Sequence, residues 1–117
     1  MARKAFVEPA TVKLELSEGD WIEVKRELTY GEQLQLQDES SRRSEEDDKL
    51  RFVYSSFYVA HLVAWIVDWS FEDDNGRVEV TTDSIRALKS DIAGEINTAL
   101  NKYEAEQDAL KNVVTPG

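Results

Sequence analysis

The sequence predicts an α+β fold, in which an N-terminal β-hairpin packs on a helical core. Residues 11–16 and 21–27 alternate apolar and polar side chains on either side of a Ser-Glu-Gly-Asp turn, which is typical of two half-buried strands. Residues 50–71 are almost uncharged, as expected of a buried central helix. Residues 83–111 repeat aliphatic side chains at helical spacing. Together these patterns predict one hairpin, one central apolar helix and one long C-terminal helix.

The length of the chain suits one domain. It has 117 residues, of which 41% are hydrophobic, and a chain of this size buries roughly two-thirds of its unfolded surface. We expect a flexible arm over residues 1–11, a single domain over residues 12–111 and a short tail over residues 112–117, because the apolar periods fall in the middle range.

The composition restricts the partners. The 24 acidic and 14 basic residues give a net charge of −10, so nucleic acid and anionic membranes would repel the chain. No cysteine is present for a disulfide or a thiolate, and the N-terminal MARKAFVEPA is too poor in apolar residues for a signal peptide. We therefore expect a cytosolic protein with cationic or apolar partners, and neither nucleic acid nor membrane among them.

The predicted hairpin has one apolar face. In its second strand Ile22 and Val24 fall on one side, and Trp21 and Glu23 fall on the other. Gly19 can supply the positive φ that the turn needs. A two-stranded hairpin is marginally stable on its own, so we expect a helix to cover the apolar face.

A short helix and a charged segment follow the hairpin. Thr29 and Glu32 have the spacing of a capping box, in which each side chain accepts a hydrogen bond from the other residue's backbone N–H. We expect this helix to reach about Gln37. Residues 38–49 contain no apolar side chain, so they are predicted to form a charged loop or a frayed helix. A charged docking segment is the alternative.

The predicted central helix is apolar nearly all round, and such a helix must be covered on two sides. Its aliphatic side comprises Phe52, Val59, Leu62, Val63, Ile66 and Val67. Its aromatic stripe comprises Tyr54, Tyr58, His61, Trp65 and Trp69. Tyrosine and tryptophan are enriched at interfaces because they combine a large apolar area with a polar tip. The stripe is therefore either part of the core or a partner-binding surface, and the partner-binding surface is our site hypothesis.

The last part of the chain is predicted to form a turn, a short strand and the long C-terminal helix. Asn75-Gly76 is a common hairpin dipeptide, and Val78 and Val80 then alternate as in a strand. The final helix can be capped near residue 82 or 83. Its apolar stripe comprises Ile85, Leu88, Ile92, Ile96, Leu100 and Tyr103.

The side chains needed for catalysis or metal binding are scarce. His61 is the single histidine, with Asp68 the nearest acid on the same helical face, and a histidine in an apolar helix is more often structural than catalytic. The acidic turn before Gly76 does not match a calcium loop, because that register would place Phe71 where an aspartate is needed. No glycine-rich phosphate loop occurs. We expect no catalytic, cofactor or metal site and conclude that the chain is not an enzyme.

Two segments resemble a known family. The run Asp20-Trp-Ile-Glu-Val-Lys-Arg-Glu-Leu-Thr-Tyr-Gly-Glu32 is similar to the opening of the tail assembly chaperones of long-tailed, siphovirus-type bacteriophages. So is Asp68-Trp-Ser-Phe-Glu-Asp-Asp-Asn-Gly76, followed by Val78, Val80, Thr81 and then Ser84-Ile85-Arg86-Ala87-Leu88. The resemblance covers about residues 19–106. The chain departs from the family pattern at residues 38–49, where a more apolar helical segment is expected.

The resemblance implies a non-enzymatic protein made in the cytoplasm of the infected bacterium and absent from the mature virion. Its partners would be the tape measure protein, which it keeps soluble, and tail tube subunits, which it helps to recruit. The family supplies no site at the level of single residues. If the aromatic stripe is not covered within one chain, we also expect a homo-oligomer.

Two other functions stay open. The net charge of −10 could belong to an acidic inhibitor or DNA mimic, although the carboxylates are scattered along the chain and do not gather on one face. A structural component of the tail is the third possibility, and it would be found in purified virions.

Overall fold

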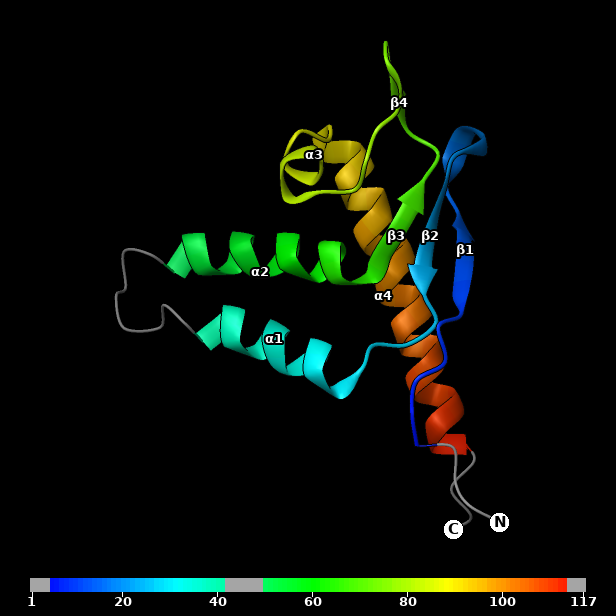
Figure 1. Cartoon of the computed structure of the whole chain (residues 1–117), viewed down its shortest axis with the longest axis vertical. Helices are drawn as coiled ribbons and strands as arrows, with labels where there is room; N and C mark the ends of the chain where they lie inside the picture. The colour runs from blue at the N-terminus through cyan, green and yellow to red at the C-terminus, as the bar shows by residue number, and fades with distance from the viewer. Residues whose placement is uncertain (1–4, 42–49, 114–117) are drawn as a thin grey trace.

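The fold consists of a three-stranded antiparallel sheet, the long helix α4 (Ser90–Val113) across one face of it, and a helical hairpin that projects from it (Figure 1). The helical hairpin is formed by α1 (Tyr30–Ser41) and α2 (Leu50–Trp65). The computed structural model describes the backbone of residues 5–41 and 50–113, and the side chains of residues 5–38 and 58–110. The α+β fold with an N-terminal hairpin and a long C-terminal helix is the one that the sequence predicts.

The N-terminal hairpin is confirmed. It consists of β1 (Thr11–Glu15) and β2 (Trp21–Lys25), joined by the 3-10 turn η1 (Ser17–Gly19). Gly19 has a φ of 81° in this turn, which the glycine adopts without steric cost. Ile22 and Val24 are fully buried, whereas the alternate side chains of β2 are partly exposed, so the predicted inner face is the right one.

The predicted central helix is shorter than expected. Helix α2 (Leu50–Trp65) ends where the third strand, β3 (Ile66–Trp69), begins, and β3 pairs antiparallel with β2. The prediction of one helix over residues 50–71 is therefore wrong after Trp65. The β-branched side chains that open β3 suit a strand, and the exposed edge of β2 supplies the hydrogen bonds that a strand needs.

A bulge in β3 sets which of its side chains reach the core. Ile22 lies opposite Trp69, and Val24 lies opposite Ile66, so Val67 is the extra residue between the two pairings. Because of this extra residue, Ile66 and Trp69 are both buried while Val67 is exposed.

The segment after β3 also differs from the prediction. Strands β4 (Glu72–Asp73) and β5 (Gly76–Arg77) form a small separate hairpin whose turn is Asp74-Asn75, so the turn lies one residue earlier than predicted. Gly76 has a φ of 107° and starts the second strand. Val78 and Val80 follow that strand as irregular chain, so the strand predicted for them is wrong.

The C-terminal region contains two helices where one was predicted. Helix α3 (Thr82–Arg86) is capped by Thr81, which forms a capping box with Ser84, and α4 (Ser90–Val113) begins after a turn. The predicted cap at residue 82 or 83 is therefore wrong by one or two residues. The long helix begins at residue 90, and its predicted apolar stripe does face the core: Ile96, Leu100 and Tyr103 are buried.

The capping box of the first helix is confirmed. Helix α1 (Tyr30–Ser41) begins where the Glu32 N–H donates to Thr29 Oγ1 over 3.1 Å and the Thr29 N–H donates to Glu32 Oε1 over 3.0 Å. The helix continues four residues past the predicted end and takes in the start of the charged segment. The remainder of that segment, residues 42–49, lies outside the described residues, as do the ends of the predicted arm and tail at 1–4 and 114–117.

One core joins the elements. Its buried members are Ile22, Val24, Leu28, Leu62, Trp65, Ile66, Trp69, Ile85, Ile96, Leu100 and Tyr103. A hydrogen bond of 2.8 Å from the Tyr103 hydroxyl to the carbonyl oxygen of Arg26 ties α4 to the chain between β2 and α1. Within the described residues, none of the helices has the length and apolar character needed to cross a membrane.

Candidate partner-binding surface

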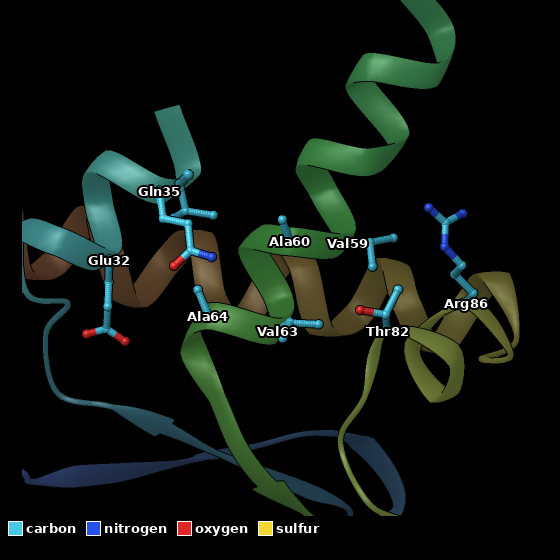
Figure 2. A pocket seen from close by; sticks show the side chains of 9 residues that line it. Glu32, Gln35, Val59, Ala60, Val63, Ala64, Thr82 and Arg86 are labelled. Atoms are coloured by element: carbon cyan, nitrogen blue, oxygen red, sulfur yellow. The ribbon is translucent and has the colours of Figure 1, made fainter. Parts of the chain in front are cut away.

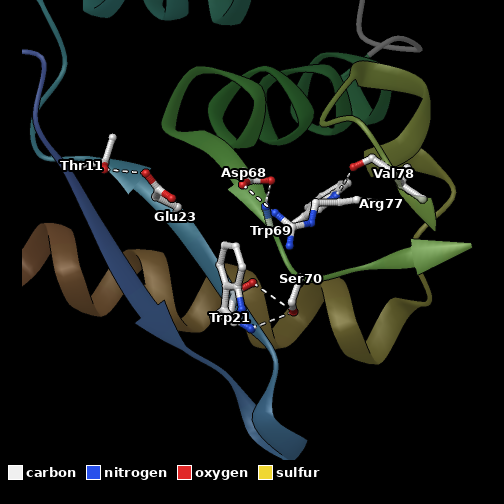
Figure 3. A network of polar contacts seen from close by, with 8 residues as sticks. All are labelled: Thr11, Trp21, Glu23, Asp68, Trp69, Ser70, Arg77 and Val78. Atoms are coloured by element: carbon white, nitrogen blue, oxygen red, sulfur yellow. Dashed lines mark hydrogen bonds and ion pairs between the residues drawn. The ribbon is translucent and has the colours of Figure 1, made fainter.

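The predicted aromatic stripe does not form one surface, because its residues belong to two elements. Trp69 lies in β3, where its side chain is 1% exposed. Its indole N–H donates to the carbonyl oxygen of Val78 over 2.7 Å (Figure 3), and its ring meets Phe71 edge to face with 5.4 Å between centroids. This side chain is part of the core and is not available to a partner.

Trp65 is also in the core. It is the last residue of α2, its side chain is 8% exposed, and its ring stands edge-on to Tyr103 with 6.2 Å between centroids. Its buried Nε1 has no hydrogen-bond partner among the described residues. For Trp65 and Trp69, the structure therefore agrees with the core alternative stated from the sequence.

His61 connects two helices. Its Nε2 lies 3.2 Å from Glu104 Oε1, so the imidazole of α2 meets a carboxylate of α4. The acid expected from the sequence, Asp68, lies on the outer face of the sheet and pairs with Arg77 over 3.1 Å (Figure 3). His61 thus links α2 to α4.

Tyr58 is the one member of the stripe that the structure shows at the surface, with 55% of its side chain exposed. The side chain of Tyr54 lies outside the described side chains. The aromatic stripe therefore supplies one exposed side chain among the described ones, and the candidate surface on α2 consists of other residues.

A groove of about 390 Å³ crosses α2 between α1 and α3 (Figure 2). The floor consists of the small apolar side chains Val59, Ala60, Val63 and Ala64. One wall is formed by Glu32, Gln35 and Leu36 of α1, and the other by Thr82 and Arg86 of α3. Val63 remains 36% exposed in it, so the groove contains an apolar side chain that the described residues leave partly uncovered.

Sequence reasoning did not find this groove. Val59 and Val63 were placed on the aliphatic side of α2 and assigned to the core, which the structure bears out only in part. A usable signal was the pair Ala60 and Ala64, one helical turn apart, because small side chains on a helix allow another element to approach closely. The wall formed by α3 could not be foreseen while residues 83–111 were read as one helix.

The two walls of the groove carry opposite charges. The ammonium of Lys25 and the backbone N–H of Thr29 lower the pKa of Glu32, which keeps its carboxylate ionised. Arg86 stands on the other wall, and within the described residues no carboxylate forms an ion pair with it. A partner in the groove would thus meet an apolar floor, with the Glu32 carboxylate, already paired with Lys25, on one side and the Arg86 guanidinium on the other.

A second, more polar hollow of about 760 Å³ lies on the other side of α1, near His61 and the C-terminal half of α4. Its lining mixes carboxylates, amides and one arginine with Phe6, Leu28 and Trp65. Within the described part of the chain, no group of histidine, aspartate and glutamate side chains is placed to hold a metal ion.

The comparisons with known proteins add no relative. Neither a protein-family model, nor a curated protein, nor a solved structure matches the chain.

Proposed function

We propose that this chain is a non-enzymatic tail assembly chaperone of a long-tailed bacteriophage, which binds the tape measure protein by apolar contact. The resemblance of Asp20–Glu32 and of Asp68–Leu88 to that family supports the proposal. In the fold these two segments form β2, the start of α1, the end of β3, the small hairpin and α3. They contribute Glu32 to one wall of the groove and Arg86 to the other.

The observation that carries the proposal is the uncovered groove on α2. A tape measure protein is a long, largely helical chain with apolar faces, and an amphipathic helix binds by laying such a face into an apolar groove. The floor from Val59 to Ala64 supplies the apolar surface, and its small side chains leave room for the side chains of the incoming helix.

This mechanism replaces the aromatic stripe with the groove. Trp65 and Trp69 hold the core together, so their role in partner binding is to position α2. The acidic surface has a separate role: a net charge of −10 keeps a complex that contains an apolar helix in solution. Recruitment of tail tube subunits, a location in the cytoplasm of the infected bacterium and absence from the mature virion belong to the same proposal.

The test is co-expression of the chain with the tape measure protein encoded beside it, followed by capture of one partner. Val63→Lys places a charge on the apolar floor and should abolish capture. Val67→Lys is the matched control, because Val67 is a valine of similar exposure (43% against 36%) that lies on the bulge of β3 and outside the groove. Both substitutions are at partly exposed sites, so both proteins should remain folded, as circular dichroism will show.

Washing the captured complex at rising salt separates the proposal from its alternative. An apolar contact releases no counterions and should survive from low to moderate salt. An acidic inhibitor that imitates DNA should lose orders of magnitude in affinity over the same range, since its binding is mainly electrostatic. Equal capture of the two valine variants, or the presence of the chain in purified virions, would contradict the proposal.

A further inference from the structure

Strand β1 is an open edge of the sheet. The strand order is β1-β2-β3, and within the described residues no strand pairs with the outer side of β1. Figure 1 shows β1 as the outermost element on that side of the molecule. An open edge presents unpaired N–H and C=O groups, to which another strand can bind.

The backbone geometry shows which residues face outward. The Leu16 N–H donates to the Asp20 carbonyl over 2.8 Å, and the Arg26 N–H donates to the Ala10 carbonyl over 2.9 Å. In an antiparallel pair, alternate residues point their backbone groups toward the partner strand. The even-numbered residues of β1 therefore bond to β2, while the N–H and C=O groups of Thr11, Lys13 and Glu15 point away from the sheet.

The opposite edge of the sheet is blocked and this one is not. The bulge at Val67 interrupts β3, and bulges protect strand edges by twisting them. The pairing of β1 with β2 is regular along all five of its residues. A lysine on an edge strand often repels a second strand, but Lys13 folds back so that its ammonium lies 4.1 Å from the centre of the Trp21 ring.

We propose that β1 pairs antiparallel with β1 of a second copy of this chain, around a two-fold axis at Leu14. In this register Lys13 lies opposite Glu15 of the second copy, and Glu15 lies opposite Lys13 of the second copy. Both are outward-facing positions, so each pair can form two backbone hydrogen bonds. Opposite charges then face each other across the pair, and they come into contact once the Lys13 ammonium turns from the Trp21 ring toward Glu15 of the second copy. The proposal does not depend on the proposed function.

Charge selects this register over its neighbours. An axis at Lys13 would place the two Lys13 side chains directly opposite each other, and like charges in that position destabilise a pair of strands. An axis at Val12 would place Lys13 opposite Thr11 and Glu15 opposite Pro9, so neither charge would face an opposite one. With the axis at Leu14, apolar side chains also face each other on the inner side of the sheet: Val12 lies opposite Leu16 of the second copy, and the two Leu14 side chains lie opposite each other. In each copy these three side chains already pack on the core.

The result is a continuous six-stranded sheet made by two copies of the three-stranded one. A two-fold axis perpendicular to the sheet keeps the inner faces on the same side, so both α4 helices cover one surface of the extended sheet. The dimer would contain two grooves, one in each copy.

The test uses charge reversal at the two outward positions. Sedimentation of the unmodified chain across a hundredfold dilution should show a dimer that dissociates. Lys13→Glu alone and Glu15→Lys alone each turn two attractive pairs into two repulsive ones, and each should raise the dissociation constant of the dimer about tenfold. The double variant, and a mixture of the two single variants, restore opposite charges at both pairs and should restore dimerisation. Melting curves of each variant control for effects on the folded monomer.

Amide hydrogen exchange provides a second measurement. In the dimer the amides of Lys13 and Glu15 should exchange more slowly as concentration rises, whereas those of Val12 and Leu14 are bonded to β2 and stay protected at all concentrations. A monomer at every concentration overturns the proposal. So does a dimer that is indifferent to the single reversals, or one in which the amides of Lys13 and Glu15 exchange as they do in the dilute protein.

Discussion

Two regions of the molecule contain similar apolar side chains but bury them to different extents. One is the sheet together with α4, and the other is the helical hairpin of α1 and α2. Ile22, Val24, Ile96 and Leu100 are fully buried between the sheet and α4. On the helical hairpin, apolar residues such as Leu34, at 40% exposure, remain in contact with solvent. Burial of apolar area is the main stabilising contribution to folding, so the first region contributes more to stability, and the second is where the proposed function places the partner.

The difference follows from how the two regions are closed. The sheet has a helix across its inner face, which gives the two packed layers that close a core. The helical hairpin has α3 beside it, but no element covers the groove across α2 in the described part of the chain. The same type of side chain is therefore buried in one region and partly exposed in the other.

The largest effect is expected where a single side chain fills the centre of the first region. Trp69→Ala removes the indole that packs on Phe71 and is held by Val78, and truncation of a buried tryptophan costs about 3–5 kcal/mol. Urea unfolding should show this loss or an unfolded chain. A change of less than about 1 kcal/mol would mean that Trp69 is not in the core and would break the comparison.

A matched pair of leucines compares the two regions directly. Leu100→Ala, in the sheet-facing stripe of α4, should lower the free energy of unfolding by about 2–5 kcal/mol. Leu34→Ala, on α1, removes a side chain that is already partly exposed and should cost less than about 1 kcal/mol. Similar losses in the free energy of unfolding at the two positions would show that the helical hairpin is packed as tightly as the sheet.

Tyr103→Phe removes one hydrogen bond from the junction between the regions and should cost about 1 kcal/mol at neutral pH. Burial raises the pKa of the Tyr103 hydroxyl above its ordinary value of 10.0. The unfolded chain therefore ionises first, and the natural protein loses stability as pH rises through 10.0 toward the raised value. The phenylalanine variant lacks this titration, so the difference between the two unfolding midpoints should shrink above pH 10.0. A difference that stays constant would contradict the burial of this hydroxyl.

The smallest effect is expected at the start of the helical hairpin. Glu32→Gln keeps an oxygen that can accept the N–H of Thr29 but loses the ion pair with Lys25, which should cost about 0.2–1 kcal/mol. Because the folded-state pKa of Glu32 is lowered from 4.5, its contribution is present above pH 4.5 and is lost as pH falls through the lowered value. Thermal melts of both proteins should therefore converge in acid. A glutamine variant as stable as the natural protein at neutral pH would show that the ion pair contributes nothing.

The elements that the sequence predicts well are those with local signals. The alternation around Gly19, the capping box of Thr29 and Glu32, and the stripe ending at Tyr103 each depend on residues close together in the chain. Strand β3 was missed because Ile66 to Trp69 continue an uncharged run that suits a helix equally well, and the choice is made by the distant edge of β2. The groove was missed for the same reason, since its walls come from three separate elements.

The direct passage from α2 into β3 has a mechanical consequence. Trp65 ends the helix and Ile66 begins the strand, so no flexible residue separates them to act as a hinge. On its other side, the hairpin is tethered to β2 by a short connection that is anchored by Leu28 in the core. Because β3 is hydrogen-bonded to β2, a change in the direction of α2 at this junction would also disturb the pairing of these two strands.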